Sequence, residues 1–89
     1  MATIRLPAAL AELAGQREME VCAATVLDAI RALDGLRPGL SDRICTEQNE
    51  PRKHVLIYVD DTEVRLLNGT KTVLKGGEII YIVPSVSGG

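Results

Sequence analysis

Aromatic residues, cysteines, histidines and long hydrophobic runs are all scarce or absent in this chain of 89 residues. Phe and Trp do not occur, and tyrosine occurs only at Tyr58 and Tyr81, so the core must be aliphatic. No stretch approaches the roughly 18 consecutive apolar residues that are needed to span a bilayer. The formal net charge is −2 and no basic cluster with interleaved aromatics occurs, which argues against a nucleic-acid-binding surface. We therefore expect neither a membrane nor a nucleic acid as a partner.

The two cysteines, Cys22 and Cys45, form no CxxC motif and are too few for a disulfide framework. We interpret both as small buried hydrophobic residues that are not joined to each other, in a reducing compartment. Residues 1–5 lack the apolar core of a signal peptide. The expected location is therefore the cytoplasm.

No catalytic or metal-binding group of residues can be assembled from the sequence. His54 is the only histidine, and a lone histidine at a strand start is more often a hydrogen-bonded surface residue than a ligand. It cannot pair with both cysteines as a base, and no acidic residues join it at metal-ligand spacing. Asp60, Asp61 and Glu63 are interpreted as a solvated hairpin tip, with a weak docking patch for a basic partner as the alternative. We expect a substrate or carrier of other enzymes rather than an enzyme.

The apolar pattern predicts a chain of strands with one main helix. Apolar residues recur at helical spacing from Val26 to Leu33, behind Thr25 as a capping residue, and Gly35 is expected to end this helix. Residues 70–74 are ambiguous. In chain order, the expected elements are a strand at 3–6, a short helix at 8–14, a strand at 18–23, the main helix, a polar loop at 46–53, a hairpin of strands at 54–60 and 63–66, and a last strand at 79–83.

The last eleven residues organise the rest of the chain. Residues 79–83 form an unbroken apolar run after a Gly-Gly turn, which predicts a strand covered on both faces and central in its sheet. Pro84 lacks an N–H and is expected to end that strand. The five residues after it would span roughly 17 Å when extended. We therefore divide the chain into a domain at 1–84 and a flexible tail at 85–89.

The order of elements predicts an α+β fold. Strands at the two ends of the chain can share one mixed sheet of about five strands if the first and last lie parallel in its middle, with the main helix packed on one face. This arrangement is the β-grasp, or ubiquitin-like, roll.

The tail ends on Gly88 and Gly89. Without Cβ atoms, these residues can enter a narrow slot and adopt backbone angles that other residues cannot. An enzyme that attacks the terminal carboxylate requires such access. The alternative is that the two glycines are only a frayed end, because termini are commonly disordered. The central strand directly before the tail favours the first interpretation.

The sequence resembles the ubiquitin-like sulfur carrier proteins over nearly its whole length. The most specific segments are IYVDDTEVR at 57–65, LKGGE at 74–78 and VPSVSGG at 83–89. Members of this family have an acidic-Gly-acidic turn before the last strand, where Gly76 replaces the first acid here, and a Pro-x-Val-x-Gly-Gly end. They include the small subunit of molybdopterin synthase, the carrier of thiamine thiazole synthesis and the carrier of a cysteine-forming route. The polar loop before His54 and the hairpin at 58–65 are most similar to the last of these.

The resemblance implies that Gly89 carries the sulfur and that Pro84, Ser85, Val86, Ser87 and Gly88 present it. A ubiquitin-activating-type adenylyltransferase and sulfurtransferase would use ATP to join the Gly89 carboxylate to AMP. A persulfide or sulfide would then displace AMP and leave a thiocarboxylate.

The resemblance also implies partners on the accepting side. A second, biosynthetic enzyme would receive the sulfur, and in the cysteine route its acceptor is an activated serine derivative bound to pyridoxal phosphate. A metalloprotease would then restore the tail. No cofactor is expected to bind to this chain itself.

Two other functions are compatible with the same sequence. A ubiquitin-like modifier would use the adenylated tail to acylate lysines of other proteins, and lysine-linked adducts would identify it. A β-grasp binding module would not need a free carboxylate, and would keep its activity after deletion of the tail.

Overall fold

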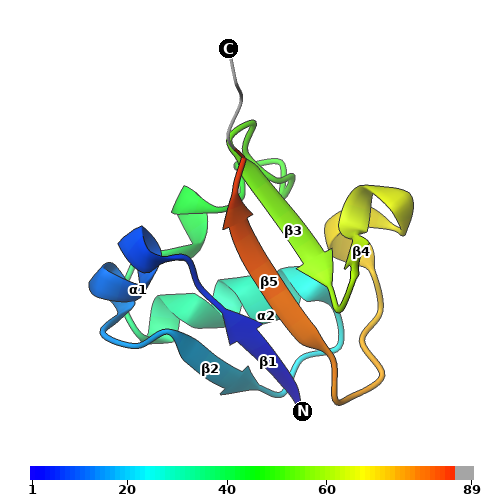
Figure 1. The fold of residues 1–89 in the computed structure, drawn as a ribbon, viewed down its shortest axis with the longest axis horizontal. Helices are drawn as coiled ribbons and strands as arrows, with labels where there is room; N and C mark the ends of the chain where they lie inside the picture. Colours follow the sequence, from blue (N-terminus) through cyan, green and yellow to red (C-terminus); the bar gives the residue numbers. More distant parts are fainter. Residues whose placement is uncertain (86–89) are drawn as a thin grey trace.

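The protein forms one five-stranded mixed sheet with its helices on one face, as a computed structural model of residues 1–85 shows (Figure 1). The strand order is β2-β1-β5-β3-β4, with β1 and β5 parallel at the centre and the other neighbours antiparallel. This topology is the expected β-grasp roll. The strands are β1 (Ala2–Arg5), β2 (Glu18–Val21), β3 (Val55–Val59), β4 (Thr62–Glu63) and β5 (Ile79–Pro84).

Two helices and several short 3-10 turns connect the strands. Helix α1 (Ala8–Ala14) ends at Gly15, whose φ of 80° lies in the left-handed region that glycine favours. Helix α2 (Val26–Arg31) begins at Thr25, whose hydroxyl accepts a hydrogen bond of 3.2 Å from the Asp28 amide. The 3-10 turns are Ala32–Gly35, Ser41–Arg43, Val64–Leu66 and Gly69–Lys71.

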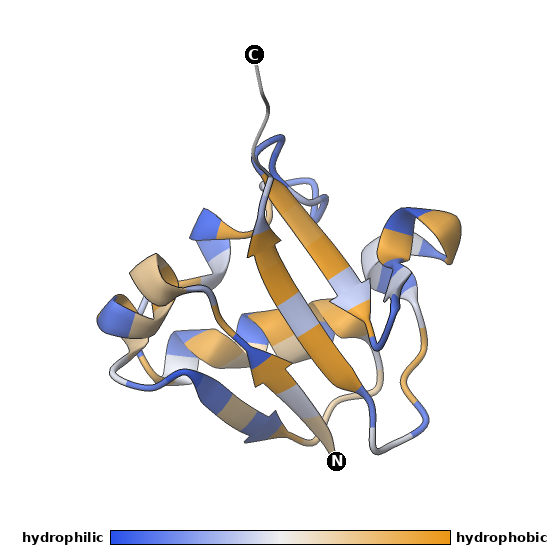
Figure 2. Ribbon diagram, in the orientation of Figure 1, coloured by the Kyte–Doolittle hydropathy of each residue, from blue (hydrophilic) through white to orange (hydrophobic). Residues whose placement is uncertain are grey.

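The core between the sheet and α2 is aliphatic, as expected from the scarcity of aromatic residues. Figure 2 shows apolar colour along β1, β5 and β3 and on α2. The side chains with less than 2% exposure come from both layers. Those on strands and helices include Ile4, Ile57, Ile80, Val26 and Ile30, and Leu33 in the 3-10 turn after α2 joins them. Burial of this apolar surface is the main driving force for the fold.

Two expectations, one about a strand and one about a buried cysteine, were wrong. Residues 63–66 do not form a strand, because β4 ends at Glu63 and a 3-10 turn follows. Cys22 is exposed, since it lies on the same side of the chain as Glu18 and Glu20, away from the core; Cys45 is buried as expected.

The last strand is central in the sheet but is not covered on both faces. Ile80 and Ile82 are buried against the helices, while Ile79, Tyr81 and Val83 on the opposite face are only half-buried. The reason is that both helices pack on the same side of the sheet (Figure 1). An unbroken apolar strand therefore leaves apolar surface facing outward.

Candidate functional site

The candidate site begins where β5 leaves the sheet. Pro84 is the last residue of the strand, as expected, and lies opposite Val55 of β3. One further hydrogen bond of 2.8 Å, from the Ser85 amide to the His54 carbonyl, holds the chain after Pro84. This contact fixes the point at which the chain departs from the body.

The residues predicted to carry sulfur and to present it beyond this point lie outside the described part of the chain. They are Val86, Ser87, Gly88 and Gly89. The structure therefore places the base of the predicted tail and the surfaces around that base.

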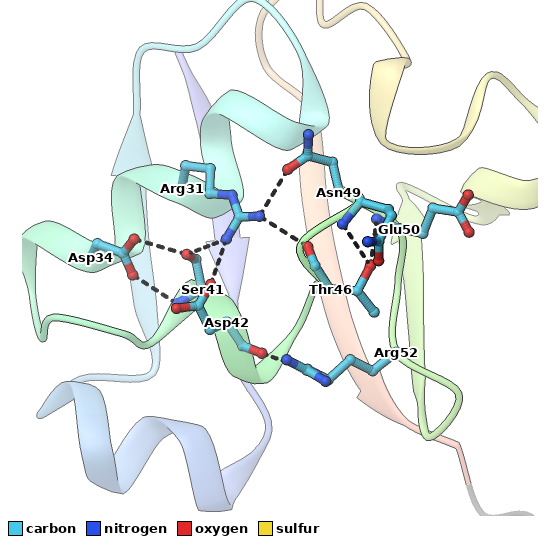
Figure 3. Close-up of polar contacts among 9 residues, drawn as sticks. Arg31, Asp34, Ser41, Asp42, Thr46, Asn49, Glu50 and Arg52 are labelled. Carbon is cyan, nitrogen blue, oxygen red and sulfur yellow. Dashed lines mark hydrogen bonds and ion pairs between the residues drawn. The ribbon is translucent and has the colours of Figure 1, made fainter.

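The polar loop that leads into His54 is held by one guanidinium group (Figure 3). Arg31 of α2 donates to Ser41 Oγ at 2.9 Å and to Asp42 Oδ1 at 3.0 Å. Its other terminal nitrogen donates to the Thr46 carbonyl at 3.2 Å and to Asn49 Oδ1 at 2.8 Å. A single side chain thus connects the main helix to the 3-10 turn Ser41–Arg43 and to the first half of the loop.

Further hydrogen bonds complete this network. Asp34 accepts from the amide and the hydroxyl of Ser41, each at 2.8 Å. Arg52 donates from Nε to the Asp42 carbonyl. These hydrogen bonds therefore fix the position of His54, whose carbonyl holds the base of the tail.

The turn before β5 is stabilised by Glu78. Its carboxylate oxygens accept from the amides of Lys75 and Gly76, each at 2.7 Å. The Lys75 amide is the main cause that holds the pKa of Glu78 below its ordinary value. Gly76 and Gly77 have φ values of 118° and 85°, which side chains rarely adopt. The Gly77 amide also donates to the Met1 carbonyl at 2.7 Å, which fixes the start of β5 beside β1.

The outer face of the sheet presents a half-exposed apolar strip that runs toward Pro84. It consists of Ile79, Tyr81 and Val83 of β5 with Leu56 and Tyr58 of β3. Tyrosine side chains, two of which lie in this strip, are enriched at protein interfaces. The strip is therefore a candidate contact surface for a partner protein.

A charged pair borders this strip on the β1 side. Arg5 forms an ion pair of 2.6 Å with Glu18 across the β1–β2 ladder. Its guanidinium carbon also lies 5.4 Å from the centre of the Tyr81 ring, within cation–π distance. This contact orders the middle of the outer face.

The cysteines and the histidine are not brought together as a catalytic group. Burial raises the pKa of the Cys45 thiol, and the nearby Arg31 and Arg52 oppose this only in part. A buried neutral thiol is a poor nucleophile. His54 is exposed at the start of β3, and its main-chain carbonyl, rather than its ring, contacts the base of the tail.

The acidic hairpin tip has a structural function that the sequence did not reveal. Asp60 accepts from the Ile79 amide through Oδ1 at 3.0 Å, and its own amide donates to the Ile79 carbonyl at 2.8 Å. Its φ of 55° is unusual for a residue other than glycine. Asp61 is exposed, and Glu63 lies 3.4 Å from Arg65.

Among residues 1–85, no three side chains of His, Cys, Asp or Glu gather as a possible metal site. The same residues include no helix with the length and apolar character to cross a membrane.

Comparison with known proteins gives consistent matches. Residues 4–89 match the ThiS family. The sulfur carrier protein CysO of Mycobacterium tuberculosis is 31% identical over 77 residues, which cover 84% of this chain and 83% of CysO. Small archaeal modifier protein 3 of Haloferax volcanii is 36% identical over 66 residues, covering 74% and 71% of the two chains. A chain in the crystal structure of the BexX/CysO complex of Amycolatopsis orientalis superposes with a TM-score of 0.88 at 29% identity, and both chains are fully covered.

Proposed function

Since the chain belongs to the ThiS family and is a sulfur carrier of the CysO type, we propose that the Gly89 carboxylate accepts, holds and donates the sulfur. The observation that supports this most is the position of β5. The most central strand of the sheet ends at Pro84, and Ser85 is held by His54, so a rigid body leads directly into the last residues. The family match extends over those residues as well.

The proposed chemistry takes place on the terminal carbon. A carboxylate oxygen of Gly89 attacks the α-phosphorus of ATP, and pyrophosphate leaves, which forms an acyl adenylate. A sulfide or persulfide sulfur then attacks the carbonyl carbon and AMP leaves; when the donor is a persulfide, a thiol then attacks the outer sulfur of the acyl disulfide, the S–S bond breaks, and a disulfide leaves. The product is a thiocarboxylate, whose sulfur is a better nucleophile than the oxygen of the original carboxylate. ATP and catalytic groups belong to the activating enzyme, and this chain acts as its co-substrate.

The proposed partners follow from this chemistry. A ubiquitin-activating-type adenylyltransferase and sulfurtransferase loads Gly89, and a biosynthetic enzyme accepts the sulfur. CysO relatives make the cysteine route the favoured destination, with a pyridoxal-phosphate enzyme as acceptor and a metalloprotease that restores the tail. The crystal structure of a CysO in complex with BexX supports the expectation of a protein partner. The apolar strip on the outer face of the sheet is the surface that we assign to the body of such a partner.

The test is loading of sulfur onto tail variants. Deletion of Gly89, or Gly88→Val, is expected to abolish loading with almost no change in stability, because surface changes usually stay within about 0.5 kcal/mol. A side chain at position 88 would meet a slot shaped for bare backbone, and a 1 Å misplacement at the reacting carbon costs on the order of 100-fold. The assay is intact-mass spectrometry after incubation with ATP, sodium sulfide and the adenylating enzyme encoded in the same genome.

Gly35→Val provides a matched control for Gly88→Val. Gly35 is exposed, and a Cβ there would meet nothing within 4 Å. This variant should load like the wild type, with one oxygen replaced by sulfur on the C-terminal peptide. Equal loading of the tail variants, or sulfur on Cys22 or Cys45, would refute the proposal.

A second function is favoured by one observation, the similarity to Small archaeal modifier protein 3. As a modifier, the chain would form an amide bond between Gly89 and a lysine of another protein. Proteomic detection of Gly-Gly remnants on lysines in cells that express this chain would support that function. If no such remnants are found while the thiocarboxylate is present, the modifier function is excluded and the carrier function remains.

A further inference from the structure

A groove lies beside the base of the tail, on the side of the sheet that carries the helices. It has a volume of about 370 Å³ and is bordered by residues 7–10 at the start of α1, residues 82–84 at the end of β5, residues 54–55 at the start of β3, and Arg43. We call it the tail-base groove. It is distinct from the apolar strip, which lies on the outer face of the sheet.

The interior of the tail-base groove is apolar. Ile82 and Val55, on its floor, are buried to 3% and 5% exposure, and Ala8 and Ala9 form an exposed wall. The accessible apolar surface of the groove is therefore that of Ala8 and Ala9, and it lies beside Pro84. Apolar surface of this kind is stabilised when a partner removes it from water.

The rim of the groove carries a positive charge without a partner. Arg43 is exposed, and within the described chain its guanidinium forms no hydrogen bond or ion pair, whereas Arg31 and Arg52 are both engaged. A second hollow that also reaches Pro84 is bordered by Arg17 and by Arg5, whose charge is paired with Glu18. No Asp or Glu borders either hollow.

The charge around the tail base is therefore opposite to that of the chain as a whole, which is −2. Acidic residues gather at the other end of the central strands, where Asp60, Asp61 and Glu78 surround the start of β5. A partner that approaches the tail meets cations and apolar surface first.

From these observations we propose that the adenylating enzyme, when it receives the tail, inserts an apolar side chain into the tail-base groove and pairs a flanking carboxylate with Arg43. This rests on the proposed function, since an enzyme that encloses Gly89 must approach Pro84. The groove shares Val83 and Pro84 with the base of the tail, so the two are covered together. Complementary charge of this kind raises association rates and selects partners.

Two variants test the two halves of the contact. Arg43→Glu reverses the rim charge, and Ala9→Gln fills the groove from an exposed helix position with a residue that helices tolerate well. Lys71→Glu is the control, because Lys71 is exposed in the 3-10 turn Gly69–Lys71, away from the groove, and gives the same change of charge. Far-UV circular dichroism checks that each variant is folded.

The measurement is the initial rate of thiocarboxylate formation against carrier concentration, with ATP, sodium sulfide and the adenylating enzyme of the same genome. Both groove variants should raise KM by about fivefold or more, the effect of about 1 kcal/mol at a contact, with kcat unchanged. The control should stay within about twofold. Arg43→Glu should also reverse or flatten the loss of kcat/KM that added salt causes in the wild type.

The outcomes separate this inference from the proposed function. Wild-type KM in both variants, with normal loading of sulfur, refutes the groove contact and leaves the carrier function intact. An effect of one variant alone, or an effect on kcat alone, also refutes the combined apolar and acidic contact. A change of oligomeric state in Ala9→Gln would show that a second copy occupies the groove instead. No loading of the wild type would refute both proposals.

Discussion

Ile80 offers the sharpest test of the fold that supports the tail. It is fully buried at the centre of β5, and its Cα partners are Ile4 in β1 and Val59 in β3. Ile80→Ala removes three side-chain carbons, which corresponds to about 2.4 kcal/mol at about 0.8 kcal/mol each. The remaining cavity adds to this, so a loss of about 3–4 kcal/mol is expected, within the usual range of about 2–5 kcal/mol.

The neighbouring residue provides a matched control. Ile79 belongs to the same strand but faces the outer side of the sheet, where it is only half-buried. Ile79→Ala should cost on the order of 1 kcal/mol, because less apolar area is lost and water can fill the space. The two variants change the same residue type in the same strand. The difference between their losses in free energy of unfolding therefore shows which face of the strand is buried.

Urea denaturation followed by far-UV circular dichroism measures both values. A temperature of about 15 °C is suitable, because small domains are most stable near it and this one can have as little as about 5 kcal/mol in total. An equal loss in the two variants, or a loss below about 1 kcal/mol for Ile80→Ala, would refute the assignment of the helix-covered face as the core. Ile82→Ala, at 3% exposure, should behave like Ile80→Ala.

Two further predictions concern titration and reactivity. The pKa of Glu78 is lowered in the folded protein, so its contribution to stability is present above the unfolded glutamate pKa of about 4.3. That contribution is lost as pH falls through the lower folded value. Glu78→Gln should therefore lower the urea midpoint at pH 7, with a difference that shrinks on acidification; a constant difference would contradict the assigned turn. Iodoacetamide under native conditions should alkylate the exposed Cys22 and spare Cys45, whose pKa is raised by burial. Peptide mass spectrometry after timed quenching measures this, and equal rates would show that Cys45 is accessible.

Strand periodicity predicted much of the fold. The alternation of Met19, Val21 and Ala23 with Glu18 and Cys22 gave the correct inner and outer sides of the second strand. The expectation that Cys22 is buried was wrong because it gave residue type more weight than the place of Cys22 in the alternation. The position in the pattern was the better evidence.

The segment after β4 shows where periodicity is insufficient. Val64 and Leu66 alternate with charged residues as in a strand, yet Val64 is 1% exposed and Leu66 is 79% exposed. A strand would place both on one face, whereas the 3-10 turn Val64–Leu66 sends them in different directions. Pairing with β3 ends at Glu63, so tertiary packing decides the conformation beyond it.

The surroundings of the tail base could not be predicted, because they depend on contacts between distant residues. The Asp60–Ile79 hydrogen bond joins residues 19 positions apart, and Arg31 reaches Asn49 over 18 positions. Neither pair has a local sequence pattern. The tail at 85–89 stays a prediction from composition, because residues 86–89 lie outside the described part of the chain.

The parallel pairing of β1 with β5 also has a consequence for biosynthesis. Thr3 lies beside Ile79, so nearly the entire polypeptide must be made before the central ladder can form. Closing so long a loop is slow, because the chain loses conformational entropy before the contacts that stabilise the closed loop can form. A ribosomal product that stops short of Ile79 lacks the middle of its sheet and is a target for proteolysis.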